Sequence, residues 1–215
     1  MAALKLSAQS LVRLLDTPDG QDSERSRLLA STIDRQADKL VKLIAYLLDV
    51  SRSGNGSLPL EFQTVDLTAL VEEAVASAQA GTNRHEIRSA ASPSPTLAVV
   101  DPARIEQVLA NLLDNAIKYS PRGGLILADV TQPGPGTVRI SVTDSGVGVP
   151  DGERGHMFDR FSRLHDPSVP GLGLGLYISR RLIELHGGTL TAEFPPEGGT
   201  RILATLPTTQ EPLKE

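Results

Sequence analysis

The chain has 215 residues, enough for one ordinary domain with a small extension. Hydrophobic residues make up 40% and aromatic residues only 3%, which predicts a true core built mainly from aliphatic side chains. The net charge of −5 argues against a nucleic-acid-binding surface, and the lack of cysteine excludes disulfide scaffolds and thiolate metal sites.

No stretch approaches the roughly 18 uninterrupted apolar residues of a membrane span. The N-terminus also lacks the charged region, apolar core and cleavage site of a signal peptide. We therefore expect no membrane contact from this segment and a cytoplasmic location.

Residues 1–53 predict an antiparallel helical hairpin. Apolar side chains recur at spacings of four and three in a first helix and in a second helix over roughly residues 22–52, as in helix bundles and coiled coils. These positions are Leu4, Ala8, Leu11 and Leu15, then Ile33, Ala37, Leu40, Ile44 and Leu47. The second helix would be on the order of 45 Å long, too long to lie on a small core. An intramolecular hairpin and half of a dimeric four-helix bundle are both possible, and we favour the dimer.

A Gly/Ser-rich segment follows the hairpin, and we place a linker at residues 54–59. Residues 60–207 then alternate between predicted strands and helices, and residues 208–215 read as a flexible tail. The strands are expected near 60–65, 86–90, 97–100, 124–131, 137–144, 189–194 and 200–206, and the helices near 67–80, 102–119 and 174–186. Such interleaving predicts an α+β domain, with a mixed sheet covered by helices on one face in a two-layer α/β sandwich.

Four short motifs lie in this domain. The helix 102–119 carries Asn111-Leu-Leu-Asp-Asn115-Ala-Ile-Lys118-Tyr119, with Asn111, Asn115 and Lys118 on one face and an apolar stripe on the other. Three further motifs follow in order: Asp144-Ser-Gly146-Val-Gly148, Phe158-Asp-Arg160-Phe161 and Gly171-Leu-Gly173-Leu174-Gly175.

This ordered set resembles the N, G1, F and G2 boxes of the ATP-binding domain of sensor histidine kinases. The resemblance implies the Bergerat (GHKL) fold, with ATP and Mg²⁺ as ligands. The glycine run at 171–175 is not a Walker loop, which needs Gly-Lys-Ser/Thr. It is not a Rossmann fingerprint either, because it follows prolines rather than a strand. Protein-kinase motifs are absent from the sequence.

The resemblance also implies roles for individual residues. Asn115 would be the Mg²⁺ ligand with support from Asn111, since an amide oxygen ligates without adding negative charge beside a triphosphate. Lys118 would reach phosphate, and Tyr119 would form a wall of the nucleotide site. The catalytic set is then Asn115, Lys118 and Arg163.

At the base end, Asp144 would accept a hydrogen bond from the adenine amine, and Gly146 and Gly148 would let the backbone approach the base. The run Gly171, Gly173, Leu174 and Gly175 would offer backbone amides at a helix start to the phosphates.

Between Gly148 and Gly171 lies a segment that resembles the family's ATP lid. Phe158 and Phe161 would anchor it by packing, and Arg160 or Arg163 could neutralise the γ-phosphate, with Arg163 favoured by the family pattern. The histidines in this segment, His156 and His165, are expected to be exposed, and His85 is expected at the surface.

The hairpin resembles the one that carries the phosphoaccepting histidine in this family. None of the four histidines lies in its first helix, so we expect the chain to begin just after that residue and not to phosphorylate itself. The hairpin would still offer a homodimer contact, weakened by truncation, and a docking face for a response-regulator receiver domain. The parent protein in this family is often membrane-anchored.

Three functions remain open. The first is the ATP-binding kinase core of a sensor histidine kinase, which passes the γ-phosphoryl to a histidine for relay to a response regulator. The second is a non-transferring ATP-binding and dimerisation module, and the third is another ATPase of the GHKL fold. The hairpin that leads directly into the domain argues against the third.

Overall fold

The computed structural model describes residues 59–90, 95–162 and 173–209. The chain divides into two units, Met1–Leu58 and Pro59–Glu215, and every described residue belongs to the second. The hairpin expected over residues 1–53, and the dimer contact expected from it, lie outside the described residues. So does the expected linker, apart from Pro59.

The larger of two sheets has five strands. Their order is β2 (His85–Ala90), β4 (Gly124–Gly134), β5 (Thr137–Asp144), β7 (Thr200–Pro207) and β6 (Thr189–Glu193). The pair β2–β4 is parallel and the other neighbours are antiparallel. A small antiparallel sheet pairs β1 (Gln63–Asp66) with β3 (Leu97–Val100).

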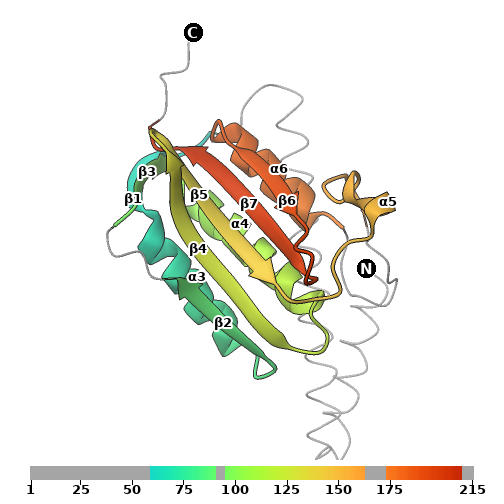
Figure 1. Ribbon diagram of the computed structural model, residues 1–215. Coiled ribbons are helices and arrows are strands. Elements are labelled where there is room, and N and C mark those ends of the chain that lie inside the picture. The colour runs from blue at the N-terminus through green and yellow to red at the C-terminus, as the bar shows by residue number, and fades with distance from the viewer. Residues whose placement is uncertain (1–58, 91–94, 163–172, 210–215) are drawn as a thin grey trace, which may run out of the picture. The chain divides into compact units, whose positions relative to one another are not determined.

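Three long helices cover one face of the larger sheet (Figure 1): α3 (Leu67–Ala80), α4 (Pro102–Lys118) and α6 (Gly175–Leu185). A fourth helix, α5 (Asp151–Arg154), is a single short turn. The predicted two-layer α/β sandwich with a mixed sheet is therefore confirmed.

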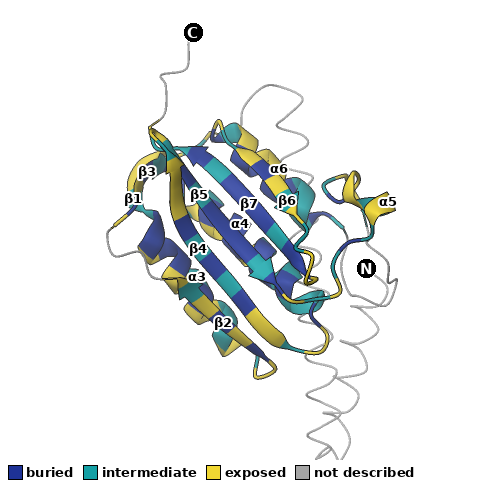
Figure 2. Cartoon of the chain, in the orientation of Figure 1, coloured by how far each residue is buried: buried dark blue, intermediate teal, exposed yellow. Residues whose placement is uncertain are grey.

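The core lies between the two layers (Figure 2). On β5, Val138, Ile140 and Val142 alternate with more polar residues and are at most 2% exposed. The apolar stripe predicted on α4 is also buried, and its residues are Ile105, Val108, Leu112 and Ala116. Burial of each such aliphatic side chain contributes about 1.5–3 kcal/mol, so this interface holds α4 on the sheet.

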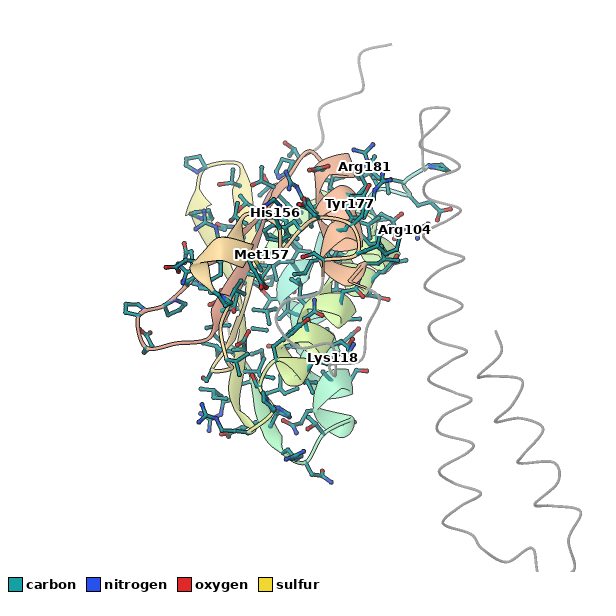
Figure 3. The ribbon with its side chains drawn as sticks, turned by 90° about the vertical axis from the view of Figure 1, so that its right-hand side faces the viewer. Arg104, Lys118, His156, Met157, Tyr177 and Arg181 are labelled. Atoms are coloured by element: carbon teal, nitrogen blue, oxygen red, sulfur yellow. The ribbon has the colours of Figure 1, made fainter. Side chains whose placement is uncertain are left out.

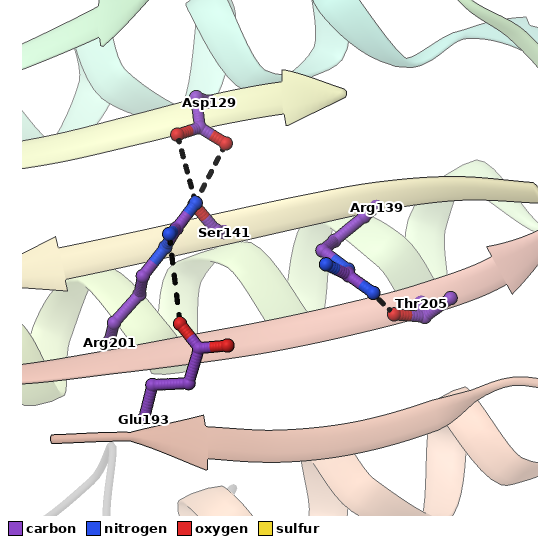
Figure 4. A network of polar contacts seen from close by, with 6 residues as sticks. All are labelled: Asp129, Arg139, Ser141, Glu193, Arg201 and Thr205. Carbon is purple, nitrogen blue, oxygen red and sulfur yellow. Dashed lines mark hydrogen bonds and ion pairs between the residues drawn. The ribbon is translucent and has the colours of Figure 1, made fainter. Parts of the chain in front are cut away.

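The opposite face of the sheet carries a polar network instead of a second helical layer (Figure 4). Arg201 lies between Asp129 and Glu193, at 3.6 and 3.7 Å, and donates to the hydroxyl of Ser141. The guanidinium of Arg139 donates to Thr205 at 3.1 Å. Both arginine head groups therefore have polar partners on neighbouring strands of this face.

A buried histidine joins the ends of two helices. His186, the C-cap of α6, is 0% exposed, and its Nδ1 lies 2.7 Å from the Leu182 carbonyl oxygen. Since a carbonyl only accepts, Nδ1 carries the proton, and Nε2 accepts from the backbone N–H of Asp101 at 3.0 Å. Asp101 caps α4, and the ring edge of His186 contacts Phe62, so the neutral imidazole fixes α4, α6 and the start of the domain together.

We expect His186 to make stability depend on pH. Burial lowers the pKa of His186 below its usual value of 6.5, against smaller opposing effects of the Leu182 carbonyl and Asp101. The unfolded chain therefore binds the proton first, and the free energy of unfolding should fall as the pH drops below 6.5 and level off below the folded-state pKa. Thermal unfolding from pH 8 to 5 measures this, and the His186→Gln variant should lose the step that His186 causes. Parallel curves for the two proteins would contradict it.

The ordered domain continues beyond the predicted end of its last strand. Thr208, placed in the tail by sequence, donates its N–H to Gly136 and accepts at its carbonyl from Val99. The other predicted bounds agree within three residues; β1 starts later, at Gln63, and β4 reaches Gly134 through a register irregularity after Thr131. The short helix α5 was not predicted. Among the described helices, none is long and apolar enough to cross a membrane.

Candidate nucleotide site

The asparagine-rich face belongs to α4. The helix starts where Asp101 accepts a hydrogen bond from the Arg104 N–H at 3.2 Å and Pro102 supplies a fixed φ. With the apolar stripe buried against the sheet, the helix geometry places Asn111, Asn115 and Lys118 together on a neighbouring face. The predicted grouping of these three side chains on one face is consistent with this placement.

That polar face meets the first turn of α6. A Cβ at Gly175 would lie 3.8 Å from atoms of both Asn111 and Asn115, and Asn111 donates to the Ser179 hydroxyl at 3.4 Å. No side chain caps the N-terminus of α6 within the described residues, so its first amides and positive helix end lie beside two neutral carboxamides. Figure 3 shows Lys118 and Tyr177 on these two helices of one layer. This arrangement suits an anion with a bound metal.

Lys118 forms an ion pair with Asp114, one turn earlier on α4. The two side chains are 28% and 42% exposed. An ion pair of this kind contributes less than about 1 kcal/mol, because solvent screens it. A phosphate group could therefore draw Lys118 away from Asp114 at little cost.

Asp144, at the end of β5, is a buried carboxylate with 8% exposure. Its Oδ1 accepts from the Gly146 N–H at 2.8 Å, and it also accepts from the backbone of Thr200. Burial raises the pKa of Asp144 above its usual value of 3.8, and the two backbone hydrogen bonds oppose that shift. A carboxylate buried in this way can accept one more hydrogen bond from a ligand.

Two glycines allow the backbone to approach closely around Asp144. A Cβ at Gly146 would lie 2.2 Å from the Tyr119 carbonyl oxygen, which also accepts from the Val147 N–H at 3.0 Å. A Cβ at Gly199 would lie 1.9 Å from the Asp144 carbonyl oxygen. The end of α4, the turn after β5 and the turn before β7 therefore meet at this carboxylate.

The last two motifs are also in contact. Gly173 has a φ of +66°, and a Cβ there would lie 2.3 Å from the Ser162 carbonyl oxygen. Gly148, with a φ of +71°, lies against Gly199. Hence the structure brings described residues of all four motifs into one connected region.

We expect Gly199→Ala to disrupt this region far more than Gly198→Ala. Both glycines have positive φ, of 81° and 102°, so alanine is strained at either position by about 1–2 kcal/mol. Only at Gly199 would the added Cβ meet backbone, because a Cβ at Gly198 has nothing within 4 Å. Thermal unfolding should show the larger loss in Gly199→Ala by about a further 1–3 kcal/mol. Equal losses would mean that the turn before β7 is not pressed against Asp144.

Arg160 lies beside the first turn of α6. Its Nη2 donates to the Tyr177 hydroxyl at 2.7 Å, and its guanidinium lies 4.8 Å from the ring centroid. Phe158 lies under the guanidinium of Arg180, at 5.9 Å, but Phe161 is 57% exposed with a φ of +61°. The predicted packing role of Phe161 therefore stays a prediction.

Other predicted residues have mixed outcomes. Leu174 is buried at 3% exposure, so only its backbone could contact a ligand. His156 is exposed as predicted, with a side chain 76% accessible that contacts Asp159. Arg163, His165 and Gly171 lie outside the described residues, and their predicted roles stay predictions.

Two contacts near the site were not predicted from the sequence. His85 is buried at 9% exposure and hydrogen-bonded, so its predicted surface position is wrong; the loop after α4 packs over it. Thr200 supports Asp144 through its backbone, and the Gly198-Gly199 pair before β7 was the available signal. Both contacts join segments far apart in sequence.

The polar side chains here fit a metal ion that is already coordinated by the phosphate oxygens of a ligand. Within residues 59–90, 95–162 and 173–209, no group of three His, Cys, Asp or Glu side chains could hold a metal ion. Asn111 and Asn115 offer neutral amide oxygens beside the start of α6, which complements a hard cation already neutralised by a polyphosphate.

Comparison with known proteins agrees with this geometry. Residues 100–210 match the family model described as histidine kinase-, DNA gyrase B- and HSP90-like ATPase. The sensor protein KdpD of Escherichia coli K12 is 36% identical over 187 residues, covering 86% of this chain and 21% of KdpD. This chain thus spans about a fifth of that relative's length.

Solved structures give the same result. The mycobacterial sensor histidine kinase MprB aligns with a TM-score of 0.61 and 30% identity, over 70% of this chain and 100% of the other. Full-length ShkA in complex with AMPPNP aligns with a TM-score of 0.69 and 26% identity, over 99% of this chain and 47% of ShkA. KdpD is a sensor protein and MprB a sensor histidine kinase. On the match over residues 100–210, this chain belongs to the histidine kinase-, DNA gyrase B- and HSP90-like ATPase family.

Proposed function

We propose that this chain is the kinase core of a two-component sensor histidine kinase, which binds Mg-ATP and transfers the γ-phosphoryl group to a histidine. The observation that carries the proposal is the meeting of Asn111 and Asn115 with the uncapped start of α6, in one connected region with the buried carboxylate of Asp144. A nucleotide matches these two features, because its polyphosphate suits the helix start and its base donates hydrogen bonds to a carboxylate.

At the base end, Asp144 would accept from the adenine amine, while Gly146 and Gly148 keep side chains away from the base. Tyr119, which ends α4 and bonds to Val147 through its carbonyl, would line the site between base and phosphates. Buried acceptors discriminate strongly, because a ligand without the matching donor leaves them unpaired.

At the phosphate end, Asn115 would ligate Mg²⁺ with Asn111 beside it, and Lys118 would exchange Asp114 for a phosphate oxygen. Amides from Gly173 to Gly175 would bind phosphate at the helix start. Bound Mg²⁺ supplies charge neutralisation for the transferring group. Arg160, held near α6 by Tyr177, and Arg163 are the candidates to neutralise the γ-phosphate, and Arg163 remains our preference.

The residues do this work by positioning and by electrostatics, as phosphoryl transfer requires. We assign no general base or nucleophile, because the histidine that accepts the phosphoryl would come from a helical hairpin. We further propose that the whole protein acts as a homodimer through its hairpin and relays the phosphoryl to a response-regulator receiver domain.

The test is phosphotransfer from γ-labelled ATP, with the chain alone and then with a histidine-bearing hairpin in trans. Label on the added hairpin, and none on the chain alone, is the expected result. An unlabelled hairpin that nevertheless binds the chain would favour a non-transferring ATP-binding module. Release of labelled phosphate without a labelled protein would favour another ATPase of this fold.

A further inference from the structure

A buried imidazole supports the nucleotide site from the edge of the sheet. His85 is the first residue of β2 and is 9% exposed. Its Nε2 lies 2.8 Å from the Ser120 carbonyl oxygen, and its Nδ1 lies 2.9 Å from the Thr82 hydroxyl. Because the carbonyl can only accept, Nε2 carries a proton and donates it to Ser120. Both ring nitrogens thus have a hydrogen-bond partner.

The backbone that carries this ring is held by Gln79, at the end of α3. The Gln79 amide donates to the carbonyls of Thr82 and His85, at 2.9 and 3.2 Å, and accepts from the Ile87 N–H at 2.7 Å. One side chain therefore fixes the turn before β2 on both sides. The backbone of His85 is therefore held in place, since it cannot shift without breaking these hydrogen bonds.

On the other side, His85 holds the turn that follows α4. The Ser120 carbonyl also accepts from the Gly123 N–H at 2.9 Å, and a Cβ at Gly123 would lie 2.1 Å from the Arg84 carbonyl oxygen. The two turns are therefore in direct backbone contact. With the backbone so close, the hydrogen bond from His85 is the side-chain contact that sets where Ser120 lies.

Ser120 is one peptide away from the base end of the nucleotide site. The preceding carbonyl, of Tyr119, accepts from the Val147 N–H at 3.0 Å and faces Gly146 closely. Gly146 in turn donates its N–H to Asp144 at 2.8 Å. A continuous path of three hydrogen bonds and two peptide links, Tyr119–Ser120 and Gly146–Val147, therefore joins His85 to the carboxylate proposed to bind adenine.

We propose that His85 is a positioning residue for nucleotide binding: by holding the Tyr119–Ser120 turn, it fixes Gly146 and Asp144 in the arrangement that accepts the base. This inference rests on the proposed ATP site and adds a residue to it. Because His85 acts on the base end, its loss should weaken the binding of ATP and of ADP by the same factor.

Two substitutions separate the hydrogen bond from the bulk of the ring. In His85→Leu the volume is roughly kept but the donor to Ser120 is lost, whereas in His85→Gln the amide nitrogen can donate at the position of Nε2. Val75→Ala, in the buried face of α3, is the matched control for a general loss of stability.

The experiment is calorimetric titration of the full chain with Mg-ATP and with Mg-ADP, at a temperature well below the unfolding transition of every variant. The Kd for both nucleotides should rise by about three- to tenfold in His85→Leu, the loss expected for one hydrogen bond. In His85→Gln and Val75→Ala it should stay within about twofold of the unchanged protein.

Three outcomes decide the matter. A Kd in His85→Leu equal to that of the unchanged protein, with a lower Tm only, would make His85 purely structural and overturn the inference. A Kd in His85→Gln as high as in His85→Leu would also overturn it, since the donor would then not be the cause. If the unchanged protein bound neither nucleotide, the proposed function itself would fail.

Discussion

Replacing Asp144 with asparagine should weaken ATP binding by about a hundredfold and, at neutral pH, stabilise the nucleotide-free protein. In the proposed complex the carboxylate accepts from the adenine amine. Asparagine can keep its oxygen towards the Gly146 N–H, but its amide then faces the adenine amine, donor against donor. Loss of a hydrogen bond to a charged group, with a buried donor left unpaired, accounts for this size of effect. Titration with Mg-ATP measures it.

The gain in stability follows from the pKa of the same group. Burial raises the pKa of Asp144 above 3.8, so the folded chain holds the proton more strongly than the unfolded chain. The contribution of Asp144 is fully favourable below pH 3.8 and is lost as the pH rises through its folded-state pKa. The substituted asparagine does not ionise. The Tm of the variant should therefore exceed that of the unchanged protein by an amount that is small near pH 4 and grows as the pH rises through the folded-state pKa of Asp144. A variant that is less stable at pH 7 would contradict this.

Replacing Asn115 with alanine should lower phosphotransfer at saturating ATP by about a hundredfold or more. Its side chain lies beside Gly175 at the start of α6, where we place the metal and the phosphates. Removal of a metal ligand takes away charge stabilisation that the transferring group needs. Transfer of label to a histidine-bearing hairpin in trans measures the loss.

The same variant should also bind ATP with little response to Mg²⁺, because the ion would have lost its protein ligand. Glu106→Ala provides the control, since Glu106 is exposed on α4 away from the polar face. Full transfer activity in Asn115→Ala would show that the metal is held elsewhere.

Much of the fold could be predicted because it depends on local patterns. The apolar stripe of Ile105, Val108 and Leu112 predicted the buried face of α4, and residues 124–131 and 137–144 were expected as two strands of the sheet. The helix expected over 102–119 begins at Pro102 in the structure, within the accuracy of such local patterns. Such signals act over a few residues, so a single sequence contains them.

The contacts of the site were harder to predict because they join distant segments. His85 reads as a polar residue beside a strand, and only the packing of the turn at Ser120 buries it. The backbone of Thr200 supports Asp144 from a strand far along the chain, and the Gly198-Gly199 pair before it is only an indirect signal of that contact.

The central claim is that the region around Asp144 and α4 is an adenine-nucleotide site. Calorimetric titration of the full chain with Mg-ATP and, separately, with Mg-GTP tests it most directly. We predict that ATP binds and that GTP binds at least about tenfold more weakly, because guanine presents a carbonyl oxygen where adenine presents the amine that Asp144 accepts. Equal affinity for the two nucleotides, or no binding of ATP, would contradict the account.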